Sequence, residues 1–207
     1  MRKLLVFAGI AGLLMVTVLV PVSFAGQRAP SNLNQARAQG FDCHAVGDGT
    51  ICQFFLPDVY GPEDSGIVCG SGAGAFDIFD QGIATDSGTV WFDRNGDLTK
   101  VKVTINYSFG QWSNPLTGDT VDYTQHNTET TELAVPGDFT SGTVTNTGEN
   151  IYRIGTAAPV LLSVGRQVFN FDGSELLSNH GPNAFIAAFY EGDPHAFDQV
   201  CTALGAS

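Results

Sequence analysis

Residues 98–135 read LTKVKVTINYSFGQWSNPLTGDTVDYTQHNTETTELAV, the longest stretch with the pattern of paired β-strands. In its first part apolar and polar residues alternate, which is typical of a strand with one buried and one solvated face. The apolar positions are Val101, Val103, Ile105, Tyr107 and Phe109. The chain then turns at Asn114–Gly118 and returns from Val121, so this stretch predicts a core β-hairpin.

The returning strand is polar at its centre. Every residue from Gln125 to Glu132 is polar, on both faces of the strand, before Leu133 restores apolar character. If the strand continues unbroken, its inner polar side chains line a ligand pocket, and a buried Glu129 could act as a general acid or base. The candidate ligand-binding residues are then Tyr123, Gln125, Asn127 and Glu129. On the sequence alone we favour the simpler interpretation that the ribbon leaves the core here and is exposed.

Residues 1–25 have the pattern of a signal peptide. A short basic start precedes the apolar run Leu4–Val20, and the small residues Ser23 and Ala25 follow it, which predicts cleavage after Ala25. The alternative is an uncleaved membrane anchor, because the run nearly reaches the roughly 17–20 residues that a spanning helix needs. We expect a flexible N-terminal tail over residues 26–40 and a single disulfide-stapled β-domain over residues 41–207.

The chain is acidic. It has 9 Lys and Arg against 21 Asp and Glu, a net charge of −12, which becomes −14 (7 − 21) when Arg2 and Lys3 leave with the signal peptide. Such a surface repels phosphate backbones and anionic lipids, so we expect no nucleic-acid partner and no membrane insertion after cleavage. The expected location is secreted, and the expected partner is a small molecule or an extracellular or cell-surface partner.

The cysteine positions predict two disulfides, since all four lie in the exported part: Cys43, Cys52, Cys69 and Cys201. A two-residue turn at Gly47–Asp48 places Cys43 opposite Cys52 in a non-hydrogen-bonded pair, where side chains come closest. Elimination leaves Cys69 with Cys201. The alternative is a metal site that includes His44, but the spacing does not fit the usual zinc motifs, so we expect no metal and no cofactor.

Asn95–Gly96 is the strongest hairpin-turn signal in the chain. It places Trp91 opposite Lys100, on the outer face of the sheet. Trp91 is therefore either one half of a stacked cross-strand pair, the interpretation we favour, or part of a platform for a carbohydrate or aromatic ligand.

Nine to eleven short strands joined by tight turns follow from the rest of the pattern. Residues 56–65 are expected to form a loop, Thr147–Glu149 a turn, and Ala184–Tyr190 a strand. A short C-terminal helix is predicted to start with Asp193 as its N-cap. The predicted fold class is all-β, an antiparallel meander that forms a barrel or a two-layer sandwich, with this helix at its end.

Few motifs point to chemistry. Asp77, Asp80 and Asp86 form a loose group of carboxylates, which is more typical of a solvated strand edge than of a metal site. The turn Asp93–Asp97 resembles a calcium loop only superficially, and the chain has no nucleophile elbow or phosphate-binding loop. We therefore favour an exported, non-catalytic binding or interaction module. The alternative is a small β-barrel enzyme (a cyclase, isomerase or hydrolase) with a carboxylate in the lumen.

Four pieces of the chain, residues 90–97, 113–118, 162–169 and 200–204, resemble a group of small exported β-meander proteins of Gram-positive, high-GC bacteria. The resemblance covers roughly residues 76–205. It implies secretion and a β-meander and transfers no functional residue, because the shared pieces are turns and strands. In outline such a barrel is also similar to lipocalins and allene oxide cyclases, whose sequence motifs are missing here.

Overall fold

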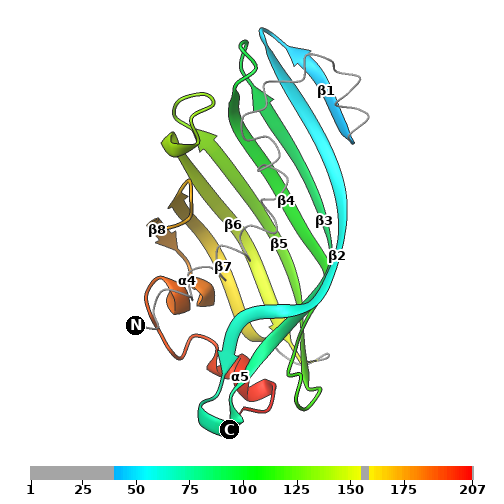
Figure 1. Ribbon diagram of the computed structural model, residues 1–207, viewed down its shortest axis with the longest axis vertical. Helices are drawn as coiled ribbons and strands as arrows, with labels where there is room; N and C mark the ends of the chain where they lie inside the picture. The colour runs from blue at the N-terminus through cyan, green and yellow to red at the C-terminus, as the bar shows by residue number, and fades with distance from the viewer. Residues whose placement is uncertain (1–39, 155–158, 207) are drawn as a thin grey trace.

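The computed structural model describes residues 40–154 and 159–206 (Figure 1). The predicted signal peptide and nearly all of the predicted N-terminal tail lie outside these residues. The described chain forms one sheet of eight antiparallel strands in sequence order. The strands are β1 (Phe41–Val46), β2 (Gly49–Cys69), β3 (Phe76–Phe92), β4 (Leu98–Ser113), β5 (Thr120–Leu133), β6 (Gly142–Arg153), β7 (Pro159–Asn170) and β8 (Leu176–His180).

The sheet is open and curved. Its outer strands are β1 and β8, which do not pair with each other, so the predicted all-β meander is confirmed while closure into a barrel or sandwich is not. Two helices, α4 (Ala184–Phe189) and α5 (Asp198–Ala203), pack against β7. They lie on the concave side of the sheet (Figure 1).

Two apolar clusters fill the two ends of this concave side. One lies beside α5 and consists of Ile67, Cys69, Phe76, Ile78, Trp112, Val121, Tyr123, Tyr152, Ala184, Phe197, Val200, Cys201 and Leu204. The other lies toward the β1–β2 hairpin and consists of Cys43, Cys52, Phe54, Val90, Phe92, Leu98, Val101, Val103, Ile105 and Leu133. Strands β2, β3, β4 and β5 contribute side chains to both clusters, so the middle segments of these strands lie between the two.

The two apolar clusters determine which side chains of β5 face the concave side. Its start, at Val121 and Tyr123, belongs to the α5 cluster, and its end, at Leu133, belongs to the other. The pairing with β6 runs without a register shift from Asp122 to Leu133. Because strand side chains alternate between faces, the odd-numbered polar residues in between face the concave side. The prediction that the ribbon leaves the core here was wrong.

A β-bulge in β4 changes which aromatic residue is buried. Tyr107 pairs with Gln125 but Gly110 pairs with Tyr123, so β4 carries one residue more than β5 over this interval. The bulge reverses the alternation, and Phe109, predicted to join the core face, is 39% exposed. Trp112 is buried in its place.

Glycines make room for aromatic rings across the sheet. A Cβ atom on Gly110 would lie 2.3 Å from the ring of Tyr123, and one on Gly88 would lie 2.3 Å from the ring of Phe54. These rings therefore lie over bare backbone, a contact that compensates for the weak strand propensity of glycine. The Gly110 contact fixes the Tyr123 ring at one end of the concave face.

Two predicted breaks in the sheet are continuous strand. Residues 56–65, expected as a loop, belong to β2 and pair with β3 with two register shifts. Thr147–Glu149, expected as a turn, continues through β6 because both neighbouring strands pair with it. Pairing on both sides outweighs the local turn preference of glycine.

The C-terminal segment differs from its sequence pattern. Ala184–Phe189 is a helix and not the expected strand, because the Asn183 side chain accepts hydrogen bonds from the backbone N–H groups of Phe185 and Ile186. The second helix begins at Asp198, while Asp193 only closes a turn by accepting a hydrogen bond from the N–H of His195.

Both predicted disulfides are confirmed. Cys43 pairs with Cys52 in the predicted hairpin register, and Cys69 joins the end of β2 to Cys201 in α5. Two disulfides indicate an oxidising environment of the extracellular type. Within residues 40–154 and 159–206, no helix is long and apolar enough to cross a membrane.

The two disulfides are expected to differ in their contribution to stability. The Cys69–Cys201 bond spans 132 residues and the Cys43–Cys52 bond spans 9. In the chain-entropy model these loops correspond to about 5 and about 2.5 kcal/mol. Replacing Cys69 and Cys201 together by Ser should therefore lower the free energy of unfolding in urea more than the same change at Cys43 and Cys52. Equal losses would contradict this account.

Candidate functional site

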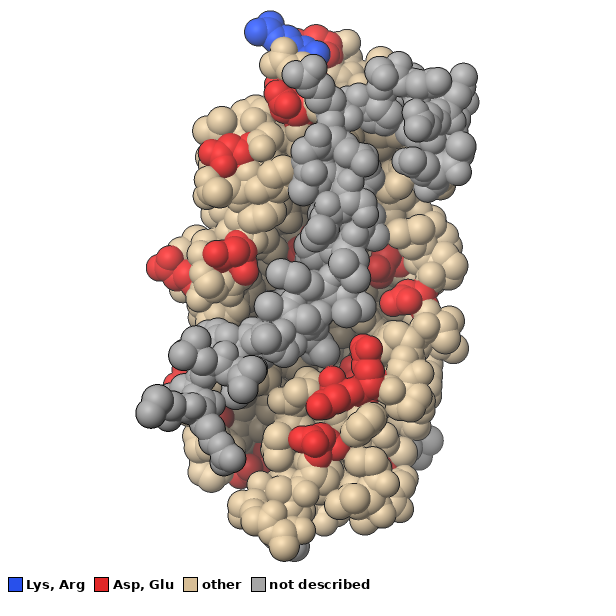
Figure 2. Space-filling view, viewed as in Figure 1, with Lys and Arg blue, Asp and Glu red and all other residues tan. Residues whose placement is uncertain are grey.

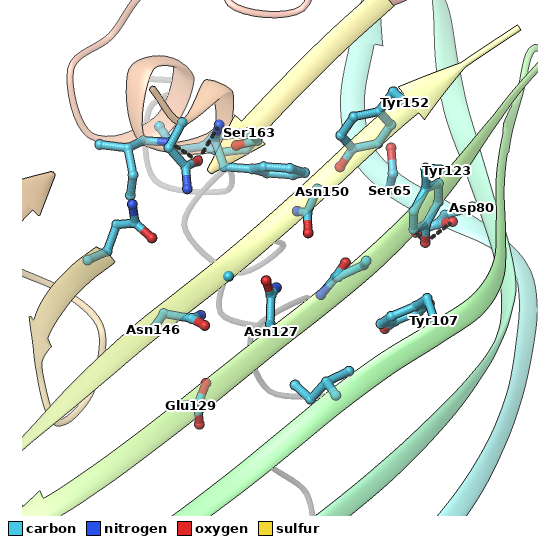
Figure 3. Close-up of a pocket in the computed structure, with 18 of the residues that line it drawn as sticks. Ser65, Asp80, Tyr107, Tyr123, Asn127, Glu129, Asn146, Asn150, Tyr152 and Ser163 are labelled. Atoms are coloured by element: carbon cyan, nitrogen blue, oxygen red, sulfur yellow. Dashed lines mark hydrogen bonds between the residues drawn. The ribbon is translucent and has the colours of Figure 1, made fainter. Parts of the chain in front are cut away.

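A cavity of about 180 Å³ lies on the concave face, between the two apolar clusters (Figure 3). Its lining changes character from end to end. Toward α5 it is aromatic and contains Asp80, with Tyr60, Tyr107, Trp112, Tyr123, Tyr152, Phe185 and Phe189. Toward the other end it is formed by carboxyl and amide side chains, from Gln125, Asn127, Glu129, Asn146, Asn150 and Gln167.

The polar end is built by cross-strand rows. Glu129 on β5 pairs with Asn146 on β6, which pairs with Gln167 on β7. Two rows further along the same face, Gln125 pairs with Asn150. Figure 3 shows Glu129 and Asn146 side by side at this end of the cavity, with Asn127 and Asn150 between them and the tyrosines.

Glycine opens the floor of the cavity. Asn127 pairs with Gly148, which pairs with Gly165 on β7, so two positions of this row carry no side chain. A Cβ atom on Gly148 would lie 2.0 Å from the Asn127 side-chain oxygen and 2.3 Å from the His126 carbonyl oxygen. The Asn127 side chain therefore lies across bare backbone.

Several polar groups at this site have no hydrogen-bond partner. Glu129 is 5% exposed, yet no hydrogen bond to its carboxyl group is found within the described residues. Three side-chain atoms are fully buried without a partner in this part of the chain: the Asn150 oxygen and the Trp112 indole N–H at the cavity, and one Asp86 oxygen outside its lining. Gln167 differs, because its amide donates to Asn179 at 3.2 Å. Buried polar groups usually have partners, so these atoms are available to bond water or a bound molecule in the cavity.

Burial raises the pKa of the Glu129 carboxyl to about 7, and the negative charge of Asp86 on β3 adds to the effect. Asp86 is also buried, and loss of solvation, reinforced by Asp58, raises its pKa to about 6. Among the described residues, neither carboxyl has a cation beside it to favour its charged form.

Asp80 lies at the aromatic end and is held by two tyrosines. The Tyr123 hydroxyl donates to it at 3.0 Å and the Tyr60 hydroxyl at 3.3 Å, while the two hydroxyl oxygens are 2.6 Å apart. Burial raises the pKa of Asp80 to about 6, although the hydrogen bonds and the nearby Trp112 indole oppose the rise. Trp112 is close enough to affect the carboxyl but makes no well-aligned hydrogen bond to it.

The surrounding tyrosines remain protonated. Burial, followed by the charge of Asp80, raises the pKa of four hydroxyls far above their usual value, namely those of Tyr60, Tyr107, Tyr123 and Tyr152. They act as hydrogen-bond donors and as aromatic surface, and not as bases.

The cavity has acidic groups and no basic ones. Glu63, Asp80 and Glu129 line it, and no Lys, Arg or His is among the described residues that do so. Figure 2 shows the face that carries α4 and α5, where acidic side chains are spread along the molecule and basic ones appear at one end.

Tyr123, Gln125, Asn127 and Glu129 thus follow one another along the same cavity, as the unbroken-strand alternative expected, and Trp91 is not part of its lining. Trp91 pairs with Lys100, whose ammonium lies 5.7 Å from the ring centroid and also bonds Glu132 at 2.6 Å. The stacked cross-strand pair is the arrangement observed.

No family model, curated protein or solved structure matches the chain. The site is therefore interpreted from its own geometry. Within the described residues, no group of three or more His, Cys, Asp or Glu side chains is placed to hold a metal ion.

Sequence reasoning missed several lining residues. Asp80 and Asp86 were assigned to a solvated strand edge, but both are buried, and Asp80 lines the cavity. Trp112 was missed because the bulge that turns it inward has no clear sequence signal. Asn146 and Asn150 could have been found, because a period of two places them on the same strand face as the aromatic Tyr152.

The hydrogen bond from Tyr123 is expected to lower the pKa of Asp80, because it stabilises the charged form. Tyr123→Phe should therefore raise that pKa above its value of about 6, as measured by ¹³C NMR titration of the carboxyl carbon. Tyr190→Phe is the control, since the Tyr190 hydroxyl donates to the Gly173 carbonyl instead. An unchanged Asp80 titration in Tyr123→Phe would contradict the assignment.

Burial of Glu129 should make stability depend on pH. Its folded pKa of about 7 lies above the ordinary 4.5, so its contribution is fully present below pH 4.5 and is lost as pH rises through 7. Glu129→Gln should remove this loss. At pH 8 its free energy of unfolding should therefore exceed that of the wild type by about 3 kcal/mol, and at pH 4 no such excess is expected. Urea titrations at both pH values test this, with exposed Glu149→Gln as the control. A destabilised Glu129→Gln at pH 8 would refute it.

Proposed function

We propose that this protein is an exported binding protein that holds a small polar molecule in the concave cavity. Two polar groups that face the cavity carry the proposal: the carboxyl of the buried residue Glu129, which makes no hydrogen bond to another described residue, and the fully buried, unpaired side-chain oxygen of Asn150. A ligand with several hydrogen-bonding groups would satisfy them, and an apolar ligand would not.

The remaining features support the same proposal. Amides both donate and accept hydrogen bonds, so adjacent Asn and Gln side chains can hold a molecule with mixed groups. The tyrosine rings at the other end supply apolar surface with hydroxyl groups at its edge. The two disulfides fit export to an oxidising compartment. The resemblance to small exported bacterial proteins and the signal-peptide pattern point the same way.

A second candidate is an enzyme that uses Glu129 as a general acid or base. Its supporting observation is the pKa of about 7 in a buried carboxyl that lines a cavity. Tyr123 does not join Glu129 in this role. Six residues separate them along β5, roughly 20 Å at the strand rise, so they would not act on one bond. Asn127 and Gln125 are the nearer positioning groups.

The binding proposal is tested by native mass spectrometry of protein purified from the culture medium of its own host. We expect a mass above that of the polypeptide, which denaturation removes. Asn127→Leu should lower the bound fraction, with about a tenfold loss of affinity for the released ligand, because two hydrogen-bonding groups are removed.

The matched control is Asn106→Leu, since Asn106 lies on the adjacent strand but is exposed on the opposite face. It should bind as the wild type does. The proposal fails if the native protein carries no ligand and a panel of polar small molecules leaves its melting temperature unchanged. Turnover of the released ligand that Glu129→Gln abolishes would favour the enzyme candidate instead.

A further inference from the structure

We propose that the ligand is an organic cation whose amine binds between Glu129 and the amides of β5 and β6. This inference rests on the proposed binding function and names the ligand class. It is drawn from the unpaired Glu129 carboxyl, the shape of the cavity around it and the charges that line it.

The Glu129 carboxyl lacks the partners that a buried carboxyl usually has. A buried carboxyl is usually paired with a cation or held by hydrogen-bond donors, because an isolated buried charge is costly. Within the described residues Glu129 has neither, although it is 5% exposed. A ligand ammonium group has three donors and one positive charge, so it supplies both kinds of partner at once.

The groups around Glu129 support an amine better than an anion. Asp86 on β3 adds a second negative charge close enough to raise the pKa of Glu129. On β4 the residue opposite Glu129 is the apolar Val103, and the adjacent positions on β6 and β7 are the amides Asn146 and Gln167. Apart from Asp80 at the far end, the other acidic and basic side chains of β3 to β7 are at exposed or half-buried positions, and Lys100 is already paired with Glu132: Asp77, Lys100, Lys102, Asp122, Glu132, Glu149, Arg153 and Arg166. No described positive group therefore competes for Glu129.

The far end of the cavity suits the same ligand class. Asp80 lies there without a basic partner among the described lining residues, and rings of Tyr107 and Tyr123 are 5.8 Å apart at that end. Aromatic faces attract cations through their quadrupoles. A neutral polyol would satisfy the amides but would leave the Glu129 carboxyl without a counter-charge.

Three five-carbon probes that differ only in their end groups test the inference: 1,5-diaminopentane, 1,5-pentanediol and glutarate. At pH 8 the diamine should bind at least tenfold more tightly than the diol in isothermal titration calorimetry, and glutarate should not bind. Glu129→Gln should remove the advantage of the diamine, while exposed Glu149→Gln should keep it. Because Glu129 takes up a proton near neutral pH, the wild type should release a proton on binding the diamine at pH 6 and lose affinity, whereas diol binding should not change.

The wild-type pH comparison keeps the test valid if Glu129→Gln folds poorly. Equal or tighter binding of the diol overturns the cation inference and leaves the binding function standing. Binding of none of the three probes also overturns it, and the native mass spectrum then decides the binding function by itself. Retention of the diamine advantage in a folded Glu129→Gln variant overturns the role of Glu129.

Discussion

The side-chain alternation of β5 is the constraint on which the site depends. Apolar residues anchor the strand in a different cluster at each end, and its pairing with β6 has no bulge between them. A register slip of one residue would bring Thr128 inward in place of Glu129 but would also expose Tyr123 and Leu133. The buried polar band is thus enforced by the apolar ends of the same strand.

This arrangement has an energetic cost. Unpaired buried carboxyl and amide groups each cost about 1–3 kcal/mol relative to solvated ones. The sheet offsets this cost with two apolar clusters, a disulfide that ties α5 to β2, and a hydrogen bond from the buried Asn114 side chain to the Leu204 carbonyl. Unpaired polar groups that are confined to one cavity, between well-packed regions, are a common property of binding sites.

The sequence predicted what depends on local patterns. The Gly47–Asp48 and Asn95–Gly96 turns set their hairpin registers correctly, and the first of them correctly placed Cys43 opposite Cys52. The sequence could not predict on which face of the sheet the polar centre of β5 lies, since that depends on contacts with two distant clusters. The bulge that buries Trp112 and the cap that makes 184–189 helical were missed because tertiary pairing and one Asn183 side chain decide them.

The most direct test of this account is the titration of the Glu129 side chain in the free protein, followed by ¹³C NMR of its carboxyl carbon and assigned with Glu129→Gln. The account predicts a pKa of about 7, because the carboxyl is buried without a partner beside Asp86. A value near 4.5, the ordinary value, would show a solvated or paired carboxyl and would contradict the inward-facing polar band.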